Sequence, residues 1–241
     1  MQQSGQSAHL NKQEELFLGL SEQLAQPFLQ ISRLAELAER ADTAAMAEYW
    51  HMTRTVADAS LQLTESYALS LRLHGKVTPL ELEPVTVSSL LYDTAGRLTP
   101  YAKQYGVALE LEPGPRAQPI LTDRAVLEAA LTSLGQVFIR AQAEAEHPAA
   151  VHVSAHRSRY GIVAGLYGSS QQLGADSLRR AHALKGRARQ PLSSLVSGPA
   201  AGVFVADSLL EALSARLHVA RYHKLTGLAA TLAPSQQLQL V

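Results

Sequence analysis

The 241 residues, with 46% hydrophobic and 17% charged side chains, have the composition of a soluble globular protein, which excludes an intrinsically disordered chain. The formal charge is zero, from 21 basic and 21 acidic residues, so no overall field favours binding to nucleic acid or to an anionic membrane. Cysteine is absent, which excludes disulfides, thiolate metal sites and cysteine nucleophiles.

The chain begins with a polar, small-residue stretch at residues 1–12, which we interpret as a flexible leader. This stretch has neither the basic region nor the apolar region of a signal peptide. No apolar run elsewhere approaches the roughly 20 residues needed to span a bilayer. We therefore expect a cytoplasmic protein that does not insert into a membrane.

A long amphipathic helix is predicted from Glu14 to Arg40. Its apolar residues recur at alternating three- and four-residue steps, which is the spacing of a helix that packs lengthwise on partner helices. A proline inside the run removes one backbone donor and should kink the helix. The apolar seam consists of Phe17, Leu20, Leu24, Pro27, Ile31, Leu34 and Ala38.

A second helix is predicted from Ala45 to about Leu73, with its N-cap at Asp42 or Thr43 and Gly75 as a left-handed cap at its end. The two helices form a hairpin over residues 13–78. Because an isolated hairpin leaves part of each apolar seam in water, we expect two copies to form a four-helix bundle; a monomeric hairpin folded onto the rest of the chain is the alternative. The second seam consists of Tyr49, Met52, Val56, Ala59, Leu63 and Tyr67.

Residues 79–241 alternate helical and strand patterns, which predicts an α+β sandwich. Apolar and polar residues alternate from residue 80 until Pro84 interrupts the pattern. A turn is expected at 113–115. Residues 168–198 are interpreted as an irregular loop. Helices are predicted from Ser88 to about Gly106, from Arg124 to about Ala145, and from Val203 to Ala215. Strands are predicted at 107–111, 151–153, 161–166, Leu217–Tyr222 and Leu228–Leu232.

Residues 20–28, LSEQLAQPF, resemble the H-box of sensor histidine kinases, and the runs LRLHGKVTPLELEPVTVSSLL and AGRLTPYAKQYGVALELE resemble the junction that follows it in that family. The resemblance covers nearly the whole chain. It implies a dimeric four-helix bundle followed by a Bergerat-type ATP-binding domain. Glu22 stands where the family carries its phosphorylated histidine, so the usual phosphoacceptor is absent.

The same resemblance locates three nucleotide-binding motifs whose chemistry this chain lacks. Magnesium-binding asparagines are replaced by Ser133 and Val137, and no acidic residue stands at the adenine-binding position. Each lost buried contact costs about 1–3 kcal/mol, which implies a pseudokinase that uses no cofactor or metal. The remaining motif positions are Leu166, Tyr167 and Gly168 in the second motif, and Gly198, Pro199, Ala200 and Gly202 in the third.

Three histidines and a basic cluster are further residues with chemistry of their own. His51, beside the second seam, is an alternative phosphoacceptor, although a surface histidine usually has no special role. His152 and His156 would lie about 13 Å apart on a strand, so we predict no metal site. The basic cluster, which is either a solvated loop or a contact for an acidic partner or a nucleotide phosphate, consists of Arg179, Arg180, His182, Lys185, Arg187 and Arg189.

From these features we predict a non-catalytic, dimeric adaptor that docks a response regulator or a partner kinase. An ATP-independent phosphotransferase that uses His51 is the alternative, and an active kinase is a third possibility. Glu22 is either an ordinary exposed carboxylate or a fixed charge that imitates a phosphorylated residue. The expected docking face consists of Glu22, Gln23, Gln26, Pro27, Gln30 and Arg33.

Overall fold

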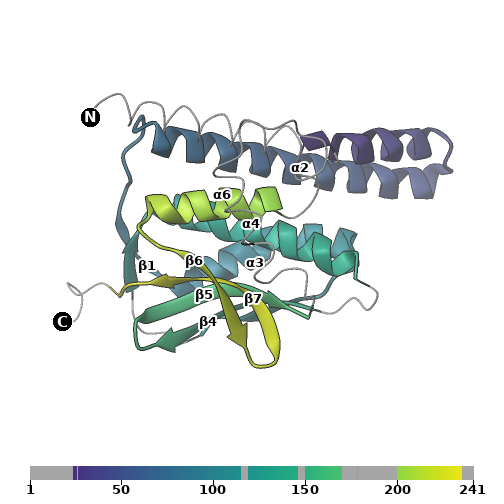
Figure 1. Ribbon diagram of the computed structural model, residues 1–241. Helices are drawn as coiled ribbons and strands as arrows, with labels where there is room; N and C mark the ends of the chain where they lie inside the picture. Colours follow the sequence, from purple (N-terminus) through teal and green to yellow (C-terminus); the bar gives the residue numbers. More distant parts are fainter. Residues whose placement is uncertain are drawn as a thin grey trace.

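In the computed structural model, a helical hairpin lies along an α/β sandwich (Figure 1). A layer of three helices separates the hairpin from a five-stranded sheet. This arrangement agrees with the predicted helical N-terminal part and α+β sandwich. The structure describes residues 24–25, 27–114, 119–145, 150–169, 178 and 200–234, without the side chains of residues 200 and 201.

The hairpin consists of a helix over residues 27–39 and the long helix α2 (Thr43–His74). Asp42 caps α2 as predicted, because its side chain accepts a hydrogen bond of 2.9 Å from the amide of Ala45. Such a cap satisfies a backbone donor that the first helical turn leaves free. The part of the first predicted helix before residue 24 lies outside the described residues.

The end of α2 differs from the prediction in one detail. Gly75 has a right-handed φ of −72°, whereas Lys76, with φ of 54°, takes the left-handed position. The amide of Val77 donates to the carbonyl of Arg72 at 3.0 Å, and the amide of Lys76 donates to that of Leu73 at 3.1 Å. These two bonds form a Schellman motif, whose closure outweighs the modest strain of a left-handed lysine.

The described parts of the predicted apolar seams are only partly buried within one chain. Leu34 and Ala38 of the first helix are buried, as are Val56, Leu63 and Tyr67 of α2. Leu63 and Tyr67 belong to the main core that the hairpin shares with the sandwich. The sandwich therefore covers the C-terminal part of the α2 seam, as the alternative of a hairpin folded onto the rest of the chain expects for that part.

The three helices beneath the hairpin agree with the predicted ones to within a few residues. They bury apolar side chains against the sheet on one side and against α2 on the other. The middle helix is buried over most of its length because it lies between these two layers. The helices are α3 (Val87–Gln104), α4 (Arg124–Ala143) and α6 (Ala200–Ala212).

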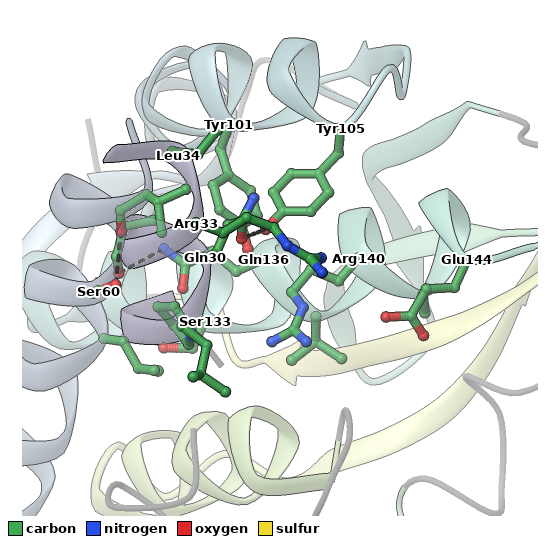
Figure 2. Close-up of a pocket in the computed structure, with 17 residues that line it drawn as sticks. Gln30, Arg33, Leu34, Ser60, Tyr101, Tyr105, Ser133, Gln136, Arg140 and Glu144 are labelled. Carbon is green, nitrogen blue, oxygen red and sulfur yellow. Dashed lines mark hydrogen bonds between the residues drawn. The ribbon is translucent and has the colours of Figure 1, made fainter. Parts of the chain in front are cut away.

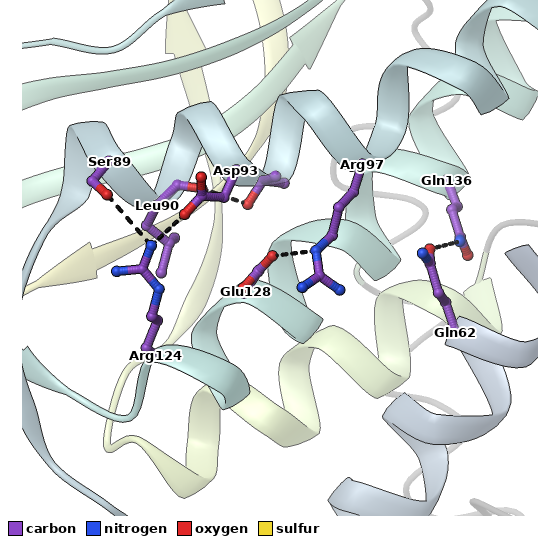
Figure 3. A network of polar contacts seen from close by, with 9 residues as sticks. Gln62, Ser89, Leu90, Asp93, Arg97, Arg124, Glu128 and Gln136 are labelled. Atoms are coloured by element: carbon purple, nitrogen blue, oxygen red, sulfur yellow. Dashed lines mark hydrogen bonds and ion pairs between the residues drawn. The ribbon is translucent and has the colours of Figure 1, made fainter. Parts of the chain in front are cut away.

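Two ion pairs join α3 to α4 (Figure 3). Arg97 Nε lies 2.6 Å from Glu128 Oε1. Arg124, the first residue of α4, pairs with Asp93 of α3 and contacts the hydroxyl of Ser89 at 3.4 Å. These contacts fix how α4 lies beside α3, and so they position the face that α4 turns toward the hairpin.

The main sheet has the strand order β2-β4-β5-β7-β6. Only β2 and β4 pair in parallel; the other pairs are antiparallel. A separate antiparallel pair joins β1 (Glu83–Thr86) to β3 (Pro119–Thr122). The sequence pattern did not predict β3, because four residues that start with proline are too few to show an alternation of apolar and polar side chains. The main strands are β2 (Leu109–Glu112), β4 (Val151–Ser158), β5 (Gly161–Gly168), β6 (Leu217–Tyr222) and β7 (Leu225–Leu232).

Most of the predicted loop at 168–198 lies outside the described residues. Among the helices that the structure does describe, none combines the length and the apolar character needed to cross a membrane.

Candidate functional site

One stripe of α4 faces the hairpin across a cavity of about 640 Å³ (Figure 2). Ser133, Val137 and Arg140 recur along this stripe at helical spacing and line the cavity. The opposite wall comes from the helix at 27–39 and from α2, and the end of α3 closes one side. The cavity therefore lies where the hairpin and the sandwich meet.

The two motif positions on α4 have little chemistry to offer a metal. Val137 is 6% exposed and carries only hydrocarbon, and Ser133 is 2% exposed. Within the described part of the chain, Ser133 Oγ has no hydrogen-bond partner. A magnesium ion needs several oxygen ligands in near-octahedral geometry, and this pair supplies one hydroxyl.

Tyrosine and amide side chains form the polar side of the cavity. The hydroxyl of Tyr105 donates to Gln30 Oε1 at 2.9 Å, so a hydrogen bond joins the hairpin to α3. Burial raises the pKa of Tyr101 well above its usual value, so that hydroxyl stays protonated. Gln136 Nε2 donates to Gln62 Oε1 at 3.4 Å and joins α4 to α2 (Figure 3).

Arg33 from the hairpin and Arg140 from α4 bring two guanidinium groups to the same cavity. Across the residues that the structure describes, neither one forms an ion pair. Arg33 is exposed and Arg140 is half-buried. The sequence reasoning overlooked Arg140, although it lies seven residues after Ser133 and therefore on the same helical face.

The second predicted motif points away from this cavity. Leu166 and Tyr167 are both fully buried, and as successive residues of β5 they face opposite sides of the sheet. Tyr167 packs on the outer face, where its ring centre lies 5.3 Å from that of Tyr222, and burial raises its pKa to about 12. Gly168 lies beside α4, where an added Cβ would come within 3.2 Å of Gln142 Oε1.

The third motif is only partly described. Ala200 begins α6, and Gly202 is buried within its first turns. Gly202 is not among the residues that line the cavity. Gly198 and Pro199 lie outside the described residues, as does the basic cluster at 179–189.

Half of the predicted docking face is described, and it borders the cavity. Pro27, Gln30 and Arg33 all line it. Gln30 is half-buried rather than exposed, because Tyr105 binds it, whereas Arg33 remains exposed. Helical periodicity shows which residues share a face but not which other element covers that face. Glu22, Gln23 and Gln26 lie outside the described residues.

The histidines lie away from the cavity. His51 is exposed on α2. His152 and His156 share β4, and His152 Nδ1 lies 3.4 Å from Glu110 Oε2. A search of the described residues finds no group of three or more side chains suited to hold a metal ion.

No family model and no curated protein matches this sequence. Solved structures do. The Acinetobacter baumannii histidine kinase AdeS aligns with a TM-score of 0.55 and 12% identity, over 88% of this chain and 97% of AdeS. Full-length ShkA, solved in complex with AMPPNP, aligns with a TM-score of 0.53 and 16% identity, over 92% of this chain and 46% of ShkA. The chain therefore has the fold of a histidine kinase core, a helical hairpin followed by an ATP-binding-type α/β sandwich.

Proposed function

We propose that this chain is a non-catalytic, histidine-kinase-like signalling adaptor that dimerises and docks a response regulator or a partner kinase. The observation that carries the proposal is the α4 stripe, where Ser133 and Val137 occupy the positions that the sequence resemblance assigns to magnesium ligands. The fold supports a role in two-component signalling, since AdeS is named as a histidine kinase.

The charges around the cavity also oppose metal binding. Arg33 and Arg140 line it and would repel a magnesium ion, whereas one carboxylate, that of Glu144, is among the lining groups. Phosphoryl transfer depends on positioning and on cations that neutralise the phosphates. Since the described lining offers one hydroxyl at the two expected ligand positions and residue 22 is glutamate, we infer that the chain does not use Mg-ATP as a phosphate donor and has no histidine at the usual acceptor position.

Exposed apolar side chains on the hairpin support a dimer. Met46, Trp50 and Leu61 recur on one face of α2 and are more than a third exposed. Phe28 and Leu37 are exposed on the first helix. Contiguous exposed apolar surface marks an interaction site, and a second copy would cover it by completing a four-helix bundle.

Binding of a regulator tests the docking part of the proposal. We expect receiver domains of response regulators from the same genome to bind the intact chain in calorimetric titrations, with affinity independent of ATP. Arg33→Glu should weaken that binding at least roughly tenfold, because interface charges select partners. Arg40→Glu is the matched control, since Arg40 is exposed on the same hairpin arm and does not line the cavity. Equal binding by both variants, or none by the parent chain, would contradict docking at this face.

Two further measurements separate the adaptor from the catalytic alternatives. An adaptor should keep its melting temperature in millimolar Mg-ATP, whereas a ligand that binds the native state raises it. Incubation with a phosphorylated regulator should leave no acid-labile phosphate on the chain. Phosphate that appears there and is lost in His51→Ala would instead establish a phosphotransferase.

A further inference from the structure

The cavity between the hairpin and α4 has an excess of positive charge that no contact within the described residues neutralises. Among the described residues that line it, the charged ones are Arg33, Arg140 and Glu144, two positive against one negative. Neither guanidinium has a carboxylate oxygen within ion-pair distance in the described part of the chain. Planar guanidinium groups match carboxylate and phosphate oxygens through paired hydrogen bonds.

A buried hydroxyl in the same cavity also lacks a partner. Ser133 is 2% exposed and lines the cavity, and its Oγ makes no hydrogen bond to any described residue. Buried polar atoms in native proteins are nearly always bonded, so an unpaired one calls for a specific explanation. A ligand atom that accepts or donates a hydrogen bond there would supply the missing partner.

Apolar side chains form a further part of the wall. Leu34 of the hairpin, Val56 and Leu63 of α2, and Val137 of α4 line it. The volume of about 640 Å³ lies in the range of small-molecule sites, which combine an apolar lining with a few polar anchors. A simple inorganic anion would leave these side chains against water, so the lining favours a ligand that also carries an apolar group.

We propose that this cavity binds a small organic anion, a carboxylate or phosphate monoester with an apolar group about the size of a ring. The anionic group lies between Arg33 and Arg140, and the apolar group packs on the aliphatic wall. This inference rests on the proposed function, in which the chain does not bind Mg-ATP. The ligand then regulates the docking of a partner. By bridging the hairpin and α4, it holds Arg33 against the sandwich and away from a partner.

The experiment uses the full chain and four probes, measured by isothermal titration calorimetry: phenyl phosphate, benzoate, benzyl alcohol and inorganic phosphate. We expect saturable binding of phenyl phosphate or benzoate that is at least roughly tenfold tighter than binding of benzyl alcohol or inorganic phosphate. Arg33→Gln and Arg140→Gln should each weaken it about fivefold or more. Arg40→Gln should leave it unchanged, because Arg40 does not line the cavity. If the Arg140→Gln variant does not fold, Arg140→Lys replaces it. Lysine keeps the positive charge but lacks the paired donors of a guanidinium, so this variant should bind the anionic probe more weakly than the parent chain, though less weakly than expected for Arg140→Gln.

Absence of saturable binding by both anionic probes would overturn the proposal, as would equal binding by the two arginine variants and the parent chain. Mg-ATP binding tighter than phenyl phosphate, lost in Arg140→Gln but unchanged in Arg33→Gln, would make the cavity a nucleotide site and also overturn it. These titrations contain no regulator. A failure of docking and a failure of ligand binding are therefore seen in separate measurements.

Discussion

Ser133 presents a buried hydroxyl without a described partner to a cavity, whereas the buried Ser70 binds a neighbour. Ser70, which is fully buried on α2, donates from its hydroxyl to Ser208 Oγ at 2.9 Å. An unpaired buried hydroxyl carries the desolvation penalty of about 1–3 kcal/mol without a compensating bond. The two serines therefore predict opposite responses to the same substitution.

Ser133→Ala should raise the free energy of unfolding of the ligand-free chain by about 1 kcal/mol, because it removes that penalty. Ser70→Ala is the matched control and should lower it by about 1 kcal/mol, since it breaks a bond and leaves Ser208 with one contact fewer. Urea denaturation measures both. If Ser133→Ala destabilises the chain as much as Ser70→Ala does, the Ser133 hydroxyl has a partner in solution.

His156 gives the chain a pH dependence of known sign. Burial lowers the pKa of its imidazole, and the ring stacks on Tyr222 with centres 5.5 Å apart. A histidine in the unfolded chain titrates near 6.5, so below that pH the unfolded state binds the proton more readily. Stability from this group is therefore complete above about pH 6.5 and is lost as the pH falls through the lower folded pKa.

His156→Phe should flatten the fall in the free energy of unfolding between about pH 7 and 5, because phenylalanine can stack on Tyr222 without titrating. His51→Gln, at an exposed position of α2, should keep the slope of the parent chain. The other titratable groups near this face, His152 and Glu112 among them, are unchanged in both variants. A slope that is the same in all three proteins would contradict the assignment to His156.

At the scale of elements, α4 depends on close packing against α3. A Cβ built on Gly135 would lie 2.2 Å from Leu98 Cδ1, and Leu98 is 1% exposed, so the side chain has little room to move. Gly96 on α3 differs, because nothing lies within 4 Å of a Cβ built there. Substitution of Gly135 therefore tests the packing between the helices, whereas substitution of Gly96 tests helix propensity alone.

Gly135→Ala should lower the free energy of unfolding by about 1–3 kcal/mol, because overpacking in a filled core forces neighbours off their preferred positions. Gly96→Ala should raise it by about 0.5–1 kcal/mol, since alanine favours the helix and meets no obstacle. Thermal and urea denaturation measure both changes. Stabilisation by Gly135→Ala would show that α3 and α4 separate without cost, contrary to the packing described.

Periodicity predicted the helices better than the short strands. The N-cap at Asp42 and the first residue of α4, Arg124, agree with the structure, because capping residues and apolar spacing are local features of the sequence. The strand at Pro119–Thr122 was missed, and Gly75 was assigned the conformation that Lys76 adopts. The strand depends on pairing with β1, which is distant in the sequence, whereas the Gly75 assignment misplaced by one residue a cap that local bonds form.

The candidate site was predictable only in part. The family resemblance located Ser133 and Val137 on one helix, and the structure places both at one cavity. That cavity also depends on the docking of the hairpin, which brings Arg33 and Gln30 opposite Arg140. A sequence pattern describes each helix face separately, so it did not show that the expected docking face and the α4 stripe meet.

At the scale of the whole molecule, the two faces of α2 serve different purposes. One face is partly buried on the sandwich, through Leu63 and Tyr67. The other leaves Trp50 at 53% and Leu61 at 59% exposed. The expected dimer therefore rests on this second row of side chains rather than on the seam.

The chain should be a dimer at micromolar concentration in size-exclusion chromatography with light scattering. Trp50→Glu combined with Leu61→Glu should give a monomer with unchanged helical circular dichroism, because charges on an apolar interface oppose association while exposed positions tolerate them. His51→Glu should remain a dimer, since residue 51 lies about 100° further round the helix than Trp50. A parent chain that is monomeric, or a double variant that stays dimeric, would show that this row does not join two copies.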